Sequence, residues 1–140
     1  MRIFLLLLLC CTYHFVEAQS KDEREIRASL MMQKDAWNRA DLPGFMDAYW
    51  RNDSLQFIGK QRVTYGWQNT FKNYQKSYPE AASMGVLSFD ILQVERLSAN
   101  HYFVVGKWSL VRAAGNLSGH FSLLYKKIGK RWLIVSDHSS

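Results

Sequence analysis

Cysteine is scarce in this sequence of 140 residues, and its two cysteines, Cys10 and Cys11, both lie near the N-terminus. Residues 19–140 contain none, so this part of the chain can form no disulfide, no thiolate metal site and no cysteine nucleophile. Without disulfides, its fold must depend on a hydrophobic core. Five Trp, eight Phe and seven Tyr in the sequence supply apolar surface for such a core.

A hydrophobic run long enough to span a membrane is also lacking. The unbroken apolar run at residues 3–11 is about half of the roughly 20 residues that a membrane-spanning helix needs. Arg2 precedes this run, a more polar stretch at residues 12–18 follows it, and Ala18 supplies the small residue required before a cleavage site. This pattern is typical of a secretory signal peptide. We therefore expect cleavage after Ala18 and export to the periplasm or out of the cell.

A lipoprotein acylated on Cys10 or Cys11 is the alternative. Acylation requires a small residue directly before the cysteine, whereas Leu9 precedes Cys10, and Cys10 itself precedes Cys11. Removal of the expected leader leaves residues 19–140, and a chain of about 120 residues is a common size for one domain. We expect these residues to form a single domain.

Acidic residues are fewer than basic ones, 12 against 18, which gives a formal net charge of +6. The basic residues are scattered, apart from a cluster of Lys126, Lys127, Lys130 and Arg131 around a turn. A nucleic-acid-binding surface needs a basic stripe interleaved with stacking aromatic residues, and none is present. We therefore predict no nucleic-acid partner and interpret the cluster as a solvated hairpin tip. Weak attraction to anionic surfaces is the alternative.

Helical periodicity dominates the first half of the chain. Ile26, Leu30, Gln33 and Trp37 recur at steps of three and four, which is one face of a helix. The pattern predicts three helices with two short extended pieces between the second and the third. Their expected bounds are residues 21–40, 42–49 and 67–78 for the helices, and 55–59 and 62–66 for the extended pieces.

The second half contains strand-like runs at residues 86–97, 101–113, 117–128 and 131–137, joined by short turn-forming links. Consecutive strands with such links pair as antiparallel hairpins. Helices first and strands afterwards indicate an α+β domain, in which helices pack on one face of an antiparallel sheet.

The last hairpin predicts a register. A two-residue turn at Gly129-Lys130 pairs residues whose numbers add to 259, so that Asp137 faces Ser122 on one face of the sheet, with His120 beside it. The opposite face of these two strands then carries Phe121, Leu123, Tyr125, Trp132, Ile134 and His138. Both faces contain many apolar residues, yet the helices can cover only one of them. We predict a homodimer through the sheet; a sheet curled enough to shield both faces is the alternative.

The order of these elements resembles the nuclear transport factor 2-like superfamily, also called ketosteroid-isomerase-like or SnoaL-like, and in particular its exported bacterial members of unknown function. Four stretches carry the resemblance: Trp37-Asn38-Arg39-Ala40-Asp41, Tyr65-Gly66-Trp67, Gly106-Lys107-Trp108, and Gly119-His120-Phe121 with the segment Arg131–Ser139. Each stretch alone is weakly specific, but their order covers nearly all of residues 19–140. The resemblance implies a curved sheet wrapped by helices into a cone with an interior pocket, and a dimer through the sheet.

The resemblance implies little about the reaction, because this fold carries enzymes, binding proteins and assembly modules. The isomerase members use an aspartate base near the end of the first long strand. The corresponding region here, residues 55–60, reads Leu-Gln-Phe-Ile-Gly-Lys and has no carboxylate. This departure argues against proton abstraction of the isomerase kind.

Asp137 and His120 are the candidate catalytic residues. A carboxylate that orients an imidazole is the smallest general-base unit, and Ser109 or Ser122 would extend it toward a triad. One alternative is that Asp137 and His138 only satisfy backbone groups and cap the last strand; another is a polar pocket mouth without catalysis. His101, His120 and His138 lie on different strands without the spacing of a zinc site, so we predict no metal and no cofactor.

Aromatic side chains are the candidate pocket residues. We expect several of them to line the cone, where a flat apolar ligand with a few polar groups would fit, although a role in the core alone is the alternative. The candidates are Trp37, Tyr49, Trp50, Tyr65, Trp67, Tyr74, Trp108 and His138. The favoured hypothesis is non-catalytic binding of a small, partly apolar molecule. The alternatives are a hydrolase or isomerase using Asp137 with a histidine, and a protein–protein interaction module.

Overall fold

The structure is a computed structural model that describes residues 19–140. The expected signal peptide, its cleavage site after Ala18 and the two cysteines lie outside the described residues. Within the described part of the chain, no helix is both long enough and apolar enough to cross a membrane.

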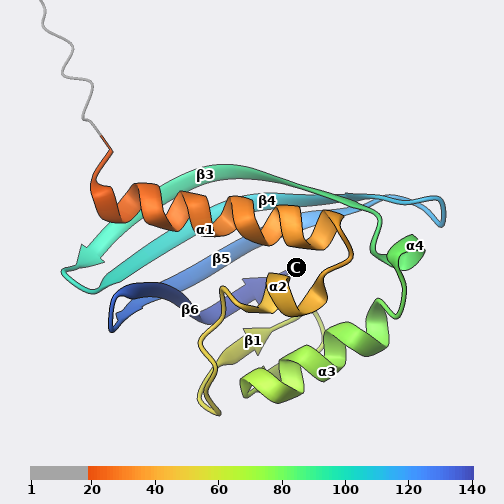
Figure 1. Ribbon diagram of the computed structural model, residues 1–140, viewed down its shortest axis with the longest axis horizontal. Helices are drawn as coiled ribbons and strands as arrows, with labels where there is room; N and C mark the ends of the chain where they lie inside the picture. The colour runs from red at the N-terminus through yellow and green to blue at the C-terminus, as the bar shows by residue number, and fades with distance from the viewer. Residues whose placement is uncertain (1–18) are drawn as a thin grey trace, which may run out of the picture.

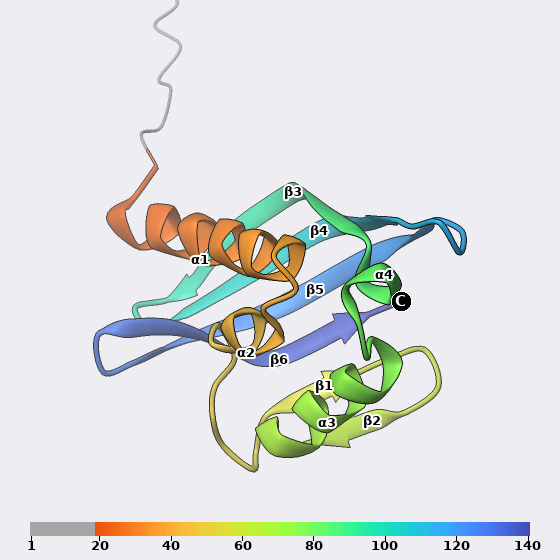
Figure 2. The ribbon, with the colours of Figure 1, turned by 45° about the vertical axis from the view of Figure 1, so that its right-hand side comes forward.

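Four helices and six strands make up the described chain. Their bounds are α1 Lys21–Asn38, α2 Leu42–Met46, β1 Gln56–Ile58, β2 Val63–Tyr65, α3 Trp67–Ser77, α4 Ala81–Met84, β3 Val86–Ser98, β4 His101–Val111, β5 Leu117–Ile128 and β6 Arg131–Ser139. The strands form one curved sheet in the order β2-β1-β6-β5-β4-β3, in which only the β1–β6 pair is parallel. Helices α1 and α2 cross one face of this sheet, and α3 lies beside β1 and β2 (Figures 1 and 2). The predicted α+β class is confirmed.

Side-chain hydrogen bonds hold both ends of α1. Ser20 caps its N-terminus by accepting a hydrogen bond from the backbone N–H of Glu23, and acidic residues follow in the first turn, where the helix dipole favours them. At the other end, Asn38 donates to the carbonyl of Leu87 and accepts from its N–H, at 3.0 and 2.7 Å. These two bonds fix the end of α1 against the start of β3.

Two short elements differ from the prediction. Helix α2 ends at Met46 because the following residues turn away to bond with β6: Ile134 donates to the carbonyl of Ala48, and Trp50 donates to the carbonyl of Ile134. The single-turn helix α4, which the periodicity did not predict, follows Pro79.

The predicted register of the last hairpin is correct near its turn and wrong beyond it. Pairs from Ile128 with Arg131 to Tyr125 with Ile134 add to 259, but a β-bulge follows, and Leu123 pairs with Asp137. Val135 is the extra residue. Because one inserted residue exchanges the two faces of a strand, Asp137 turns inward and His138 turns outward. Ser122 consequently faces His138 instead of Asp137.

The core fills the space between the helices and the inner face of the sheet. Its fully buried side chains come from both layers and include Ile26, Leu30, Met46, Val104, Tyr125 and Ile134. The outer face is mixed. Half-buried apolar residues such as Phe103, Val105 and Leu124 alternate there with exposed Lys107 and His120.

The basic cluster at the last hairpin is more than a solvated tip. Lys127 donates to Asp22 in the first turn of α1 at 2.9 Å, and the indole of Trp132 donates to the same carboxylate at 3.0 Å. Arg131 pairs with Asp47 at 2.7 Å. Two of the four basic side chains therefore hold the hairpin against the helical layer.

Candidate functional site

A cavity of about 780 Å³ lies between the helices and the sheet. It reaches the edge where the parallel strands β1 and β6 end, because its lining includes the loop after β1 and residues Leu117, Ser139 and Ser140. Aromatic rings form much of its wall. They are Trp37, Phe45, Tyr49, Phe57, Tyr74, Tyr78, Phe89, Trp108 and Phe121. The volume lies within the range of about 300–1,000 Å³ that is usual for small-molecule sites.

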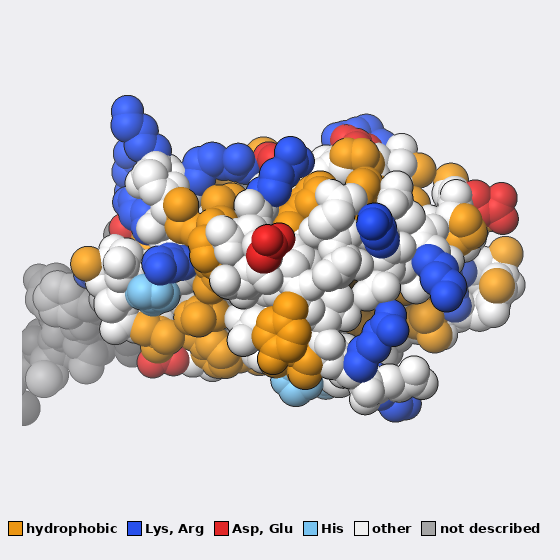
Figure 3. All heavy atoms as spheres, turned by 90° about the horizontal axis from the view of Figure 1, so that it is seen from below, with side chains coloured by type: hydrophobic (Ala, Val, Ile, Leu, Met, Phe, Trp, Pro, Cys, Tyr) orange, Lys and Arg blue, Asp and Glu red, His pale blue; other side chains and the backbone are white. Residues whose placement is uncertain are grey.

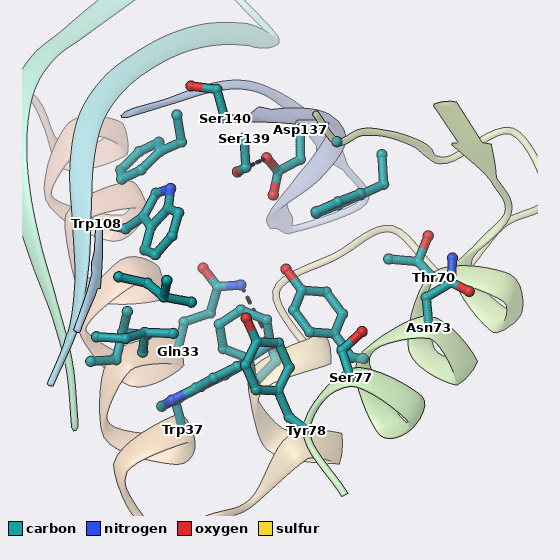
Figure 4. A pocket seen from close by; sticks show the side chains of 18 of the residues that line it. Gln33, Trp37, Thr70, Asn73, Ser77, Tyr78, Trp108, Asp137, Ser139 and Ser140 are labelled. Carbon is teal, nitrogen blue, oxygen red and sulfur yellow. Dashed lines mark hydrogen bonds between the residues drawn. The ribbon is translucent and has the colours of Figure 1, made fainter. Parts of the chain in front are cut away.

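Asp137 is the acidic group of this cavity, and only 3% of it is exposed. The hydroxyl of Tyr49 donates to one carboxyl oxygen at 2.6 Å, and the hydroxyl of Ser139 donates to the other at 2.7 Å. The bulge at Val135 turns the carboxyl inward, and the bridge between Tyr49 and Ile134 brings the phenol to it. Figure 4 shows the carboxyl and Ser139 beside the open space of the cavity.

The surroundings of Asp137 favour its neutral form more than water does. Burial raises the pKa of the Asp137 carboxyl above its ordinary value, although the hydrogen bonds from Tyr49 and Ser139 and the nearby His138 oppose the rise. Within residues 19–140, no ion pair involves this carboxyl. Burial, followed by the negative charge of Asp137, raises the pKa of Tyr49 and Tyr74 well above their ordinary value. Both phenols therefore stay protonated at neutral pH and remain able to donate.

Other polar groups face the same space. Gln33 is 97% buried; its amide nitrogen donates to the carbonyl of Phe45 at 3.2 Å, and its side-chain oxygen points into the cavity (Figure 4). The indole of Trp37 donates to the carbonyl of Met84 at 3.1 Å. The indole N–H of Trp108 is buried, and it has no hydrogen-bond partner among the described residues.

The structure brings only some of the candidate pocket residues together. Trp37, Tyr49, Tyr74 and Trp108 line the cavity. Trp67 is buried outside it and donates to the carbonyl of Met46 at 3.0 Å. Trp50, Tyr65 and His138 also lie outside the cavity, the first half-buried and the other two exposed.

The candidate catalytic pair is separated. His120 is exposed and follows the outward alternation of β5, whereas Asp137 shares the inner face with its partner Leu123. Ser109 and Ser122 belong to the same outward set as His120, so no triad forms around Asp137. No group of three or more His, Cys, Asp and Glu side chains suited to a metal ion occurs within residues 19–140.

Sequence reasoning missed several cavity residues. Gln33 carried a usable signal, since an amide in the middle of the apolar face of a helix must find partners inside the fold. Phe45, Phe57 and Ser139 carried none, because their place in the cavity depends on contacts between distant segments. Arg62, at the cavity edge, carried no signal either, because it lies in a loop of ordinary composition.

No protein-family model and no curated protein matches this sequence. Solved structures do. An NTF2-like protein of unknown function from Shewanella oneidensis MR-1 is 41% identical, with a TM-score of 0.81, over 84% of this chain and 97% of that one.

More distant structures share the fold alone. A ketosteroid isomerase-like protein from Erwinia carotovora atroseptica is 19% identical, with a TM-score of 0.67, over 87% of this chain and 97% of that one. A putative calcium/calmodulin-dependent protein kinase type II association domain from Thiobacillus denitrificans is 17% identical, with a TM-score of 0.70, over 81% of this chain and 92% of that one. With the curved sheet, the helical layer and the 41% identity taken together, this chain belongs to the NTF2-like family.

Proposed function

We propose that this protein binds a small, partly apolar molecule in the aromatic cavity and does not transform it. The observation that carries the proposal is a cavity of about 780 Å³ whose wall is rich in aromatic rings and whose buried carboxyl, Asp137, has no cationic partner within residues 19–140. Apolar walls give affinity through burial, and a few placed polar groups orient the ligand. Each oxygen of Asp137 accepts one hydroxyl and keeps a second acceptor site for a donor on the ligand.

The polar groups of the cavity favour binding over catalysis. Both oxygens of Asp137 already accept a hydroxyl, and no histidine of residues 19–140 lines the cavity. The region at residues 55–60, where isomerase relatives carry their base, has no carboxylate.

Catalysis by Asp137 is the second candidate, and one observation favours it. The pKa of its carboxyl is raised mainly by burial, and groups with such shifted pKa values in a cavity are candidates for acid–base work. In this alternative, Asp137 itself would exchange the proton, with Tyr49 holding it in place.

The experiment is identification of the bound molecule. Residues 19–140, purified from the native compartment, are analysed by native mass spectrometry and then extracted for their small-molecule content. We expect a bound mass that is lost when Leu30→Trp fills the cavity and kept in Met31→Trp, its exposed neighbour on α1. Empty protein together with no stabilisation by any member of a library of apolar compounds would contradict binding. Chemical conversion of the ligand by the wild type but not by folded Asp137→Asn would establish the enzyme.

We further propose that the protein acts outside the cytoplasm as a homodimer. The signal-peptide pattern at residues 1–18 supports export, and residues 19–140 then form the single mature domain. The half-buried apolar residues Phe103, Val105 and Leu124 on the outer face of the sheet support a second copy as the cover. The mass of the mature protein tests cleavage after Ala18.

A further inference from the structure

The charged groups of the cavity are divided between its interior and its edge. Asp137 is buried inside, whereas the other two charged residues of the lining, Lys60 and Arg62, are both basic and exposed in the loop after β1. A ligand that fills the cavity therefore meets an acceptor in its interior and positive charge at its edge.

The strand pairing gives the direction and scale of this separation. Phe57 of β1 pairs with Asp137 of β6. Gly59, two residues further along, donates its N–H to the carbonyl of Arg62 at 3.0 Å, so Arg62 lies level with Gly59 in the hairpin. At about 3.3 Å per residue, the backbone of Arg62 is roughly 7 Å beyond Asp137, and that of Lys60 roughly 10 Å beyond it.

Arg62 is oriented but not neutralised. Its guanidinium donates to the side-chain oxygen of Asn73 at 3.0 Å, and the Asn73 amide donates to the hydroxyl of Thr64 at 3.1 Å. Both partners are neutral, and no ion pair of Arg62 occurs within the described part of the chain. A guanidinium has five N–H donors in a planar fork, so most of them remain free for an oxyanion.

The charge of the whole molecule acts in the same direction. The formal net charge is +6, and the face shown in Figure 3 carries more Lys and Arg than Asp and Glu side chains. Such a surface raises the local concentration of anions. It also disfavours a cationic ligand, although a buried carboxyl alone would attract one.

We propose, on the basis of the binding function above, that the ligand is a flat amphipathic anion. Its ring-containing body lies against the aromatic wall, a hydroxyl at one end donates to Asp137, and a carboxylate at the other end is bound by Arg62 with Lys60 beside it. The wall suits a planar body because aromatic rings pack edge to face, and its own rings already do so. The ring centroids of Phe57 and Tyr74 are 5.6 Å apart, and those of Trp37 and Tyr78 are 4.8 Å apart.

Three matched probes test this class by calorimetry: 4-hydroxycinnamate, its methyl ester and 4-methoxycinnamate. The first has both polar ends, the second lacks the anion, and the third lacks the donor. We expect the first to bind at least tenfold more tightly than either of the others, with an affinity that falls as salt rises, because screening weakens an exposed charge contact.

Variants assign each end of the probe to a side chain. Arg62→Gln should abolish the preference for the acid over its ester but keep the preference for hydroxyl over methoxy. Asp137→Asn should do the reverse. Lys76→Gln, an exposed cation on α3 outside the cavity, should change neither preference and controls for net charge.

Each other outcome contradicts the inference. Equal affinity for the three probes, tighter binding of the ester, or no binding at millimolar concentration would overturn the anionic class. The binding function is judged separately by the molecule extracted from the native protein, so a neutral or cationic molecule found there would leave binding intact and exclude this ligand class.

Discussion

Tyr102 and Tyr125 are paired across β4 and β5, and both are buried, but their hydroxyl groups differ in partners. The hydroxyl of Tyr102 bonds with that of Ser20 at 3.0 Å, which ties the N-cap of α1 to the sheet. The hydroxyl of Tyr125 forms no hydrogen bond of ordinary geometry within residues 19–140. Burial raises the pKa of Tyr125, although the neighbouring Ser29 hydroxyl opposes the rise.

Removing the unpaired hydroxyl should stabilise the protein. A buried polar group without a partner costs about 1–3 kcal/mol, so we expect Tyr125→Phe to raise the free energy of unfolding by about 1 kcal/mol. Tyr102→Phe, which loses a bond, should lower it by about 0.5–1.5 kcal/mol. Urea unfolding of the two variants measures both changes. A loss of stability in Tyr125→Phe equal to that in Tyr102→Phe would contradict the assignment.

Asp137 should make stability depend on pH. Because its pKa is raised in the folded state, the folded chain binds the proton more tightly than the unfolded chain does. Its contribution to the free energy of unfolding therefore falls as pH rises from the ordinary value of 3.8 through the folded-state pKa.

The Asn variant lacks this titration. We expect the stability of Asp137→Asn, measured relative to wild type by urea unfolding, to increase as pH rises from about 4 to 8. If the difference in free energy of unfolding between Asp137→Asn and wild type stays constant over this range, Asp137 has the same pKa in the folded and unfolded chain.

At the scale of elements, the middle of the sheet depends on a glycine. Gly106 of β4 pairs with Phe121 of β5, and the Phe121 ring lies over the place where a β-carbon would stand. The same β-carbon would also lie 2.9 Å from the carbonyl of Asp90 on β3. Phe121 in turn packs edge-on against Phe89 at 5.5 Å, so the ring has little freedom to move.

Gly106→Ala should therefore lower the free energy of unfolding by about 1–3 kcal/mol through overpacking. A double-mutant cycle identifies the cause. In a Phe121→Leu background, the cost of the alanine should shrink by about 1 kcal/mol, because the side chain that it meets has been reduced. The same cost in both backgrounds would place the strain at the Asp90 carbonyl instead.

At the scale of the whole molecule, the proposed homodimer uses the outer face of the sheet. A dimer through this face would cover the half-buried Phe103, Val105 and Leu124. We expect residues 19–140 to sediment as a dimer at micromolar concentration and Val105→Arg to shift the equilibrium at least tenfold toward monomer, since it places an unpaired charge in the proposed interface.

Met31→Arg is the matched control, because Met31 is an apolar residue 52% exposed on α1, away from the sheet. It should leave the dimer intact. A wild type that sediments as a monomer at high concentration, or a dimer unaffected by Val105→Arg, would show that the outer face needs no second copy.

The sequence by itself determined the class and all the elements except the bounds of α2 and the single turn of α4. The helical steps of α1, the turn residues at Gly129-Lys130 and the alternation along β5 are local patterns, and local patterns fix helices, hairpins and the inner face up to the first irregularity. The same patterns carried the resemblance to the NTF2-like family, which the 41% identical structure confirms.

Only the tertiary structure decided the site. The bulge at Val135 has no mark in the sequence, since valine is an ordinary strand residue, and it lies next to Ile134, which bonds with the distant residues 48–50. One extra residue moved Asp137 inside and His138 outside, which separated the expected catalytic pair. The cavity likewise depends on contacts between α1, β1, α3 and the end of β6, segments far apart in the chain, so no local pattern could have placed Tyr49 on Asp137.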